Sequence, residues 1–188
     1  MKAGIGILVV VLLAVGLFGC QAVGIRNDLV TQKESIKGAW AQVDNVLQRR
    51  ADLLPNLVET VKGFAGQEQK VFGDIANARA AMAGARSPQE RIAANGQVES
   101  ALGRLLVISE NYPQLKSNEN FMRLQDELSG TENRIARERQ TYNATVQKYN
   151  TAIQLFPNNL AAGLFGFTNE DAYFKTEPAK RAVPNVKF

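Results

Sequence analysis

The sequence predicts an all-α protein: an antiparallel four-helix bundle with long helices, preceded by an N-terminal membrane anchor or lipoprotein signal. Apolar residues recur every three or four positions over most of the chain after Arg26, which is the spacing of a helix face turned toward a core. No stretch alternates polar and apolar residues over the length of a strand. An apolar run from Ile5 to Phe18 precedes this region and predicts the anchor.

Composition limits the functions open to the chain. Its 188 residues, 45% hydrophobic and 21% charged, are enough for one domain with a real core. The net charge of +4 is too small and too scattered to indicate a nucleic-acid partner. The absence of histidine excludes Ser-His and Cys-His catalysis and histidine metal sites. We therefore expect no catalytic or metal-binding residues, no cofactor and no enzyme.

The N-terminal run ends in a pattern that resembles a bacterial lipobox. Lys2 precedes the run, and the run closes with Leu17, Phe18, Gly19 and Cys20. At this length the run suits the apolar region of a secretory signal. In this interpretation residues 1–19 are a signal peptide that is removed, and Cys20, the only cysteine, carries a lipid.

An uncleaved transmembrane helix is the alternative. The segment from Ala3 to Ile25 is long enough to span a bilayer, and Gln21 is its one clearly polar residue. Cations are more frequent after this segment than before it, which favours a cytoplasmic C-terminal part for an uncleaved helix. The expected location is thus a bacterial membrane, as an exported lipoprotein or as a single-pass inner-membrane protein.

Residues 26–156 form the expected bundle domain, and its breaks are marked by turn residues. Gly84–Pro88 combines a helix-stopping glycine with Ser87 as a cap and Pro88 in the first helical position. Asn111–Asn120 is a cluster of turn residues in which Ser117 or Asn118 can cap the last helix. Phe156–Asn159 ends that helix, because the residue before a proline disfavours the helical conformation. The aromatic residues expected to supply much of the core are Trp40, Phe64, Phe72, Phe121, Tyr142 and Tyr149.

Pro55 raises the question of a further break. A single helix from Asp28 to Met82 would be about 80 Å long, which exceeds what a domain of this size covers. A turn at Arg50–Leu54 removes the difficulty, since Asp52 would cap a new helix with Pro55 in its first turn. One long kinked helix is the alternative.

Two segments resemble the LemA family. The first is "AWAQVDNVLQRRADLLPNLVETVKGFAGQE", and the second is "YPQLKSNENFMRLQDELSGTENRIARERQTYNATVQKYNTAIQLFPNNLAAGLFGF". The resemblance covers nearly the whole chain after Gly24 and leaves out the tail "EPAKRAVPNVKF". It implies an N-terminal membrane anchor and a helical bundle, and it implies no known reaction. Some members have a similar Gly-Cys junction, which supports lipidation of Cys20.

Several charged residues allow two interpretations. Glu68 and Glu138 lie on otherwise apolar stripes, so they form either a buried carboxylate pair or two stripe-edge residues paired with arginines such as Arg139. Burying carboxylates is costly, which favours the stripe edge. Arg49 and Arg50 form a phosphate or lipid-headgroup patch in one interpretation and part of a solvated helix face in the other, which is the more frequent arrangement.

The C-terminal third contains a repeat and an uncharged segment. Tyr-Asn occurs twice, one heptad apart, in "TYNATVQKYN". This spacing places both pairs on one helix face, with the tyrosines in the core and the asparagines bonded to neighbouring helices or backbone. The segment 157–174 either folds over the bundle end or docks a partner or membrane, and residues 175–188 are an expected flexible tail. The docking candidates are Leu160, Leu164, Phe165 and Phe167.

These observations favour a membrane-anchored interaction or scaffold protein of the bacterial cell envelope with an envelope protein as partner. The alternative is a small-ligand-binding protein or enzyme that uses carboxylate and arginine side chains in a bundle cleft. Strongly shifted pKa values where such groups converge would favour the alternative.

Overall fold

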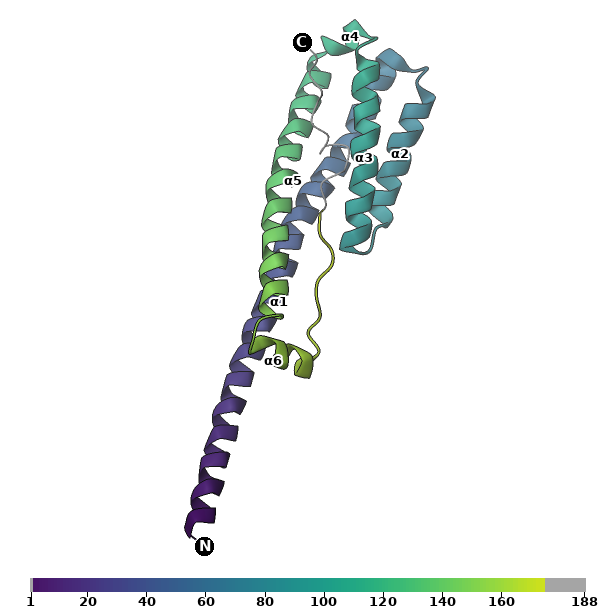
Figure 1. Ribbon diagram of the computed structural model, residues 1–188. Coiled ribbons are helices and arrows are strands. Elements are labelled where there is room, and N and C mark those ends of the chain that lie inside the picture. The colour runs from purple at the N-terminus through teal and green to yellow at the C-terminus, as the bar shows by residue number, and fades with distance from the viewer. Residues whose placement is uncertain (1, 175–188) are drawn as a thin grey trace, which may run out of the picture. The chain divides into compact units, whose positions relative to one another are not determined.

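The protein is all-α, as predicted (Figure 1). The computed structural model describes residues 2–174, except for the side chains of residues 2–5, 7–11, 13–15, 17 and 18. Within these residues the chain contains no strand. The helices are α1 (Lys2–Ala65), α2 (Gln69–Gly84), α3 (Pro88–Ser109), α4 (Pro113–Lys116), α5 (Glu119–Ala152) and α6 (Asn158–Phe165).

The chain divides into two compact units, and both long helices contribute to each. Unit 1 comprises Met1–Ala39 and Ala144–Asp171, and unit 2 comprises Trp40–Asn143 and Ala172–Phe188. Each unit therefore takes one part of α1 and one part of α5.

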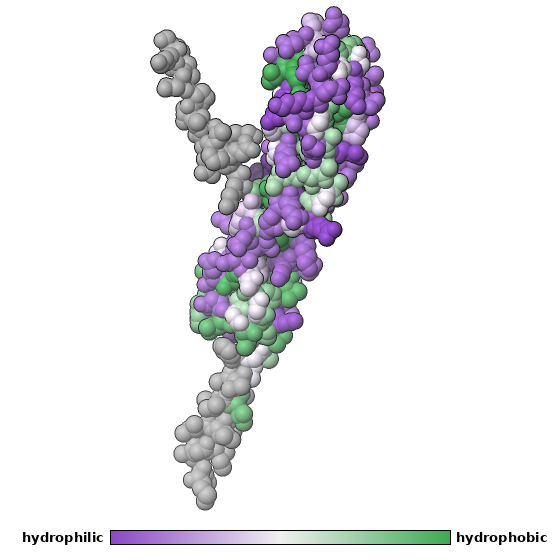
Figure 2. Space-filling view, turned by 90° about the vertical axis from the view of Figure 1, so that its right-hand side faces the viewer, coloured by the Kyte–Doolittle hydropathy of each residue, from purple (hydrophilic) through white to green (hydrophobic). Residues whose placement is uncertain are grey.

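Unit 1 has a small core that the first part of α1, the end of α5 and α6 share. Its fully buried residues include Leu29 of α1 and Val146 and Tyr149 of α5. From α6, however, the core receives only small side chains, those of Ala161 and Ala162. Figure 2 shows hydrophobic surface, in green, gathered at the level that α6 occupies in Figure 1.

The turn predicted at Arg50–Leu54 is wrong. Helix α1 continues through this stretch, and the first turn of unit 2 lies at residues 66–68 instead. Ala51 and Leu54 are buried and continue the apolar stripe of the helix without a change of phase. The length argument failed because α1 extends through two units and not one domain. Asp52 caps nothing and accepts a hydrogen bond from Gln48 Nε2 at 2.9 Å.

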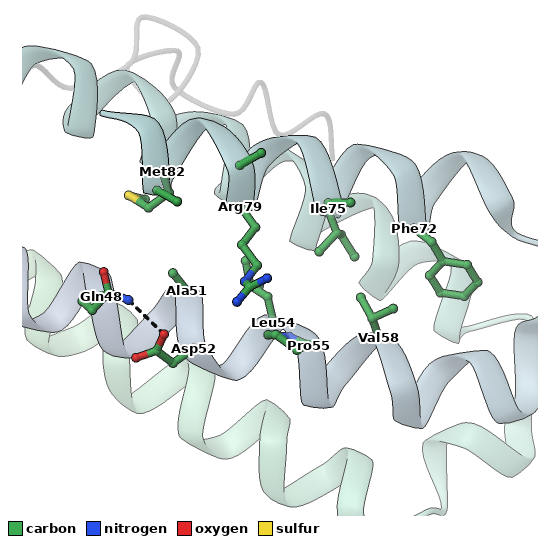
Figure 3. A pocket seen from close by; sticks show the side chains of 13 residues that line it. Gln48, Ala51, Asp52, Leu54, Pro55, Val58, Phe72, Ile75, Arg79 and Met82 are labelled. Carbon is green, nitrogen blue, oxygen red and sulfur yellow. Dashed lines mark hydrogen bonds between the residues drawn. The ribbon is translucent and has the colours of Figure 1, made fainter. Parts of the chain in front are cut away.

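Pro55 is tolerated inside α1 beside a groove between α1 and α2. The groove has a volume of about 340 Å³, and Leu54, Pro55 and Val58 line it from α1. Figure 3 shows these side chains facing Phe72, Ile75 and Met82 of α2. The proline still removes one backbone donor from the helix interior, so α1 forms here because of its buried stripe and in spite of its local sequence.

The remaining breaks follow the sequence closely. Ser87 and Glu90 form a capping box at the start of α3, with Pro88 in the first turn. Asn118 is the residue that caps α5, since its Oδ1 accepts the Phe121 N–H at 3.0 Å. Two differences remain. The short α4 lies inside the predicted turn cluster, and α5 ends at Ala152, before the predicted Phe156.

Most of the predicted core of unit 2 is buried. Phe72, Phe121 and Tyr142 are 1–6% exposed, and Trp40 packs edge-on against Tyr142 with ring centroids 5.4 Å apart. Phe64 is the exception, because it is 39% exposed. It belongs to the last turn of α1, where the next segment turns away at Gly66.

Among the residues that the structure describes, no helix combines the length and apolar character needed to cross a bilayer. Most side chains of the expected signal peptide 1–19 and of the expected span Ala3–Ile25 are outside the described ones. The predicted tail 175–188 lies outside the described residues as well.

Replacing Pro55 with alanine should stabilise the protein by about 1–2 kcal/mol, because it restores a helical N–H while giving up some rigidity of the unfolded chain. Thermal unfolding of the full chain in detergent, followed by circular dichroism, measures the change. Pro88→Ala is the control, because that proline occupies the first turn of α3 and should give no such gain. Equal shifts for both variants would contradict the explanation.

Candidate functional site

A buried arginine joins three helices of unit 2. Arg50 of α1 is only 5% exposed. Its Nη1 lies 2.7 Å from Glu132 Oε2 on α5 and 3.9 Å from Glu99 Oε1 on α3. The same nitrogen donates a hydrogen bond to Asn95 Oδ1 of α3 at 3.3 Å. Arg50 is therefore the point at which α1, α3 and α5 are held together by polar contacts.

A second arginine completes the charge balance of this cluster. Arg139 Nη2 of α5 lies 3.5 Å from Glu99 Oε1, so two guanidinium groups face two carboxylates. Burial lowers the pKa of Arg50, while the charges of Glu132 and Glu99 oppose that shift. Arginine stays protonated in proteins, and its neighbouring carboxylates compensate for the cost of burying the charge.

The interpretation of Arg50 as part of a solvated face is wrong. Arg50 follows the buried Leu47 by three residues and precedes the buried Leu54 by four. This spacing places it on the inner face of α1. The sequence carried that signal, but it did not identify Glu99 and Glu132 as partners.

A groove of about 640 Å³ opens beside this cluster. Arg50 and three carboxylates, Glu99, Asp126 and Glu132, contribute charge to its wall. The Nε of Arg50 is buried and makes no hydrogen bond within the described residues. The apolar part of the wall comes from α1, α3 and α5: Leu57, Leu102, Leu105, Leu106, Phe121 and Leu128. The groove thus combines a long apolar wall with more carboxylates than guanidinium groups.

Glu68 and Glu138, the carboxylates singled out from the sequence, do not converge in a pocket. Glu68 precedes α2, and its Oε1 accepts the Tyr112 hydroxyl at 3.2 Å. Glu138 lies on α5, and both carboxylates belong to half-buried residues. No group of three or more cysteine, aspartate or glutamate residues with metal-binding geometry occurs within residues 2–174.

The two Tyr-Asn pairs fix the chain after α6. The tyrosines are buried and the asparagines bond to backbone, as the heptad spacing predicted, but the spacing did not identify the segment that they hold. In unit 1, Asn150 Nδ2 donates to Glu170 O and Asn150 Oδ1 accepts Glu170 N–H, both at 2.8 Å. The buried Tyr149 donates its hydroxyl to Thr168 O at 3.0 Å. Burial raises the pKa of Tyr149, and the charge of Glu170 adds to the shift, which keeps the hydroxyl a donor.

In unit 2, Asn143 repeats this arrangement with Phe174. Asn143 Nδ2 donates to Phe174 O at 2.9 Å, and Asn143 Oδ1 accepts Phe174 N–H at 3.0 Å. The Phe174 ring stacks on Trp40 with centroids 6.1 Å apart, and the Arg139 guanidinium carbon lies 4.9 Å from its centroid. The two asparagines thus serve as an asparagine clamp, defined here as Asn143 and Asn150.

The residues predicted for docking lie on or beside α6. Leu160, Leu164 and Phe165 are exposed, Leu164 by 75%, whereas Phe167 is half-buried. The predicted lipidation site, Cys20, is exposed on α1. Segment 157–174 therefore folds back through the asparagine clamp and leaves an apolar surface on α6. Docking of a partner or membrane on that surface stays a prediction.

Replacing Asn143 with alanine should destabilise the protein by about 1–3 kcal/mol, because two backbone groups of Phe174 lose their partners. Urea unfolding gives the free energy, and limited proteolysis near Phe174 should become faster. Asn133→Ala is the matched control, because Asn133 is an exposed asparagine on the same helix. Proteolysis at the same rate in both variants would show that Asn143 does not hold the segment.

Comparison with known proteins gives several relatives. The magnetosome proteins MamQ 1 and MamQ 2 of Paramagnetospirillum magneticum are each 28% identical to this chain over 179 residues. The match covers 81% of this chain but 65% of each MamQ protein, so the chain spans just under two thirds of their length. The protein LemA of Metamycoplasma hominis is 25% identical over 155 residues, which is 80% of this chain and 69% of that protein.

At the C-terminal end, the family match extends further than the resemblance seen in the sequence. The model described as the LemA family matches residues 39–188. It includes the tail from Glu177 onward, so the prediction that this tail lies outside the resemblance was wrong. Since the match covers most of the chain, the protein belongs to the LemA family.

Proposed function

We propose that this protein is a membrane-tethered, non-catalytic interaction protein of the bacterial cell envelope. One observation carries the proposal: α1 runs without a break from the N-terminal apolar run into the packed helices. Whatever holds the N-terminal end of α1 at a bilayer, whether a lipid on Cys20 or an uncleaved apolar run, therefore also holds the folded part there. The charged groups of unit 2 support a structural role, because Arg50 and Arg139 are ion-paired with Glu132 and Glu99.

Within this function, unit 2 acts as an antiparallel four-helix bundle. Its helical segments come from α1, α2, α3 and α5. Arg50 links α1 to α3 and α5, and Arg91 of α3 lies 2.6 Å from Asp44 of α1. Arg104 of α3 pairs with Asp74 of α2. These cross-helix ion pairs give the bundle a fixed arrangement from which its surfaces can bind an envelope protein.

Two tethers are compatible with the N-terminus. In one, diacylglycerol is attached to Cys20 Sγ and residues 1–19 are removed. In the other, Ala3–Ile25 stays in the bilayer as an uncleaved helix, which is long enough to span it. Cys20 is exposed on α1, so its sulfur is accessible for the first route.

Mass spectrometry of the full-length protein extracted from bacterial membranes tests the tether. Diacylglycerol on Cys20, with residues 1–19 absent, is the result expected for a lipoprotein. An intact Met1–Cys20 segment that resists carbonate extraction is the result expected for a spanning helix. The Cys20→Ser variant is the control and should keep residues 1–19. An unmodified chain that carbonate releases from the membrane would overturn the proposed function.

A second candidate function, binding of a small amphiphilic cation, is favoured by the groove beside Arg50. The six apolar side chains of its wall suit a hydrocarbon or aromatic group. The three carboxylates of the wall, Glu99, Asp126 and Glu132, outnumber its single arginine. They suit an ammonium group at the other end of the ligand, because ammonium donates hydrogen bonds to carboxylates.

Filling the groove tests this second function. Gly103 lines the groove, and a Cβ added there meets nothing within 4 Å, so Gly103→Leu should fold and block the site. With 4-phenylbutylamine as the probe, saturation-transfer NMR on the nanodisc-held protein should show about a fivefold loss of signal in this variant, because the leucine side chain occupies the volume that the phenyl group would fill. Gly96→Leu is the control, because Gly96 is equally open but does not line the groove. Equal signals in both variants would contradict groove binding.

A further inference from the structure

Helix α6 turns its large apolar side chains outward and its small ones inward. Leu160, Leu164 and Phe165 are exposed, whereas Ala161 and Ala162 are buried against unit 1. The helix has no charged residue. A surface helix of a water-soluble domain normally has the opposite arrangement, with its large apolar residues toward the core. The arrangement therefore indicates that the outer face meets a second apolar phase.

The residues just before α6 extend this surface. Leu155 is 57% exposed and Phe156 is 79% exposed. Together with the outer face of the helix they form the α6 apolar surface, which we define as Leu155, Phe156, Leu160, Leu164 and Phe165. A contiguous exposed apolar patch of this kind marks an interaction site.

One contact fixes the position of the α6 apolar surface along α1. The Arg26 guanidinium carbon lies 5.8 Å from the centroid of the Phe165 ring, and both residues belong to unit 1. Cys20 precedes Arg26 by six residues, which is about 9 Å along a helix. Val23, between them on α1, is 56% exposed. The apolar surface thus lies beside Arg26, the residue that follows the expected span Ala3–Ile25.

Both tethers bring this position to the edge of the bilayer. If Ala3–Ile25 spans the membrane, Arg26 is the first residue beyond it. If Cys20 is acylated, its acyl chains enter the bilayer about 9 Å from Arg26. The headgroup region is about 5–8 Å thick on each side of the hydrocarbon core. Arg26 and the Phe165 ring beside it lie within this region in the first case and at its outer edge in the second.

We propose that the α6 apolar surface is a second membrane contact, which lies at the headgroup–acyl boundary of the bilayer that holds the N-terminus. This inference rests on the proposed function, since it needs the N-terminal tether. Leucine and phenylalanine side chains enter this boundary readily, and flanking cations stay at the headgroups. Arg26 and Lys33, both exposed on α1, supply those cations.

A lipid surface accounts for the composition of α6 better than a protein partner does. A protein interface of useful affinity normally surrounds its apolar centre with charged or hydrogen-bonding residues. The eight residues of α6 offer only Asn158 and Asn159 as polar side chains, both at its first turn. Bilayer contact needs no directional partner, because the hydrocarbon supplies the whole environment.

Quenching by brominated lipids tests the contact in the full-length protein. The chain is reconstituted in phosphatidylethanolamine–phosphatidylglycerol vesicles with and without bromine on the acyl chains, and vesicle flotation confirms the tether. Leu164→Trp adds an indole to the α6 apolar surface. Val107→Trp adds one at a residue of unit 2 that is 66% exposed, and it serves as the matched control. Trp40, the only native tryptophan, contributes equally to both.

The two variants separate failure of the inference from failure of the tether. We expect bromolipids to quench the fluorescence of the tryptophan at position 164 about threefold more strongly than that of the tryptophan at position 107, since only the tryptophan at position 164 meets acyl chains. Flotation with equal quenching of both variants would overturn the membrane contact while leaving the tether intact. A chain that does not float would overturn the proposed function and this inference with it.

Discussion

The structure depends on one continuous buried stripe along α1, which is apolar except at Arg50. Val43, Leu47, Leu54, Leu57 and Val61 are all 0–2% exposed, and the stripe keeps its phase through Pro55. Burial of each such side chain is worth about 1.5–3 kcal/mol, whereas a proline inside a helix costs about 3 kcal/mol. The summed burial therefore exceeds the local penalty, and the helix continues where its local sequence favours a turn.

The same stripe explains why a charged residue lies in the interior of unit 2. Arg50 occupies a stripe position, and a helix that continues through residues 50–54 has to bury it. The cost of that burial is met by carboxylates from two other helices. A buried ion pair contributes little net stability, but removing one partner leaves an uncompensated charge. The cluster therefore selects the arrangement of α1, α3 and α5 in which Glu99 and Glu132 both reach Arg50.

The chain after α6 is held by backbone recognition and not by regular secondary structure. Each residue of the asparagine clamp satisfies one N–H and one C=O of the opposing segment. An extended segment without a strand partner would otherwise leave these groups unpaired. Because the segment is fixed in this way, α6 is positioned by the chain on both of its sides, and its outer face has a defined orientation on unit 1.

The sequence by itself determined the features that depend on local periodicity. The all-α class, the break at Gly84–Pro88 and the core role of the Tyr-Asn repeat all followed from spacing, because neighbours along a helix fix which residues share a face. Only the tertiary structure decided the path through Pro55, the pairing of Arg50 with Glu99 and Glu132, and the exposure of Leu160 and Leu164. These features depend on contacts between residues far apart in the chain, and a local pattern specifies which face a residue occupies but not what that face meets.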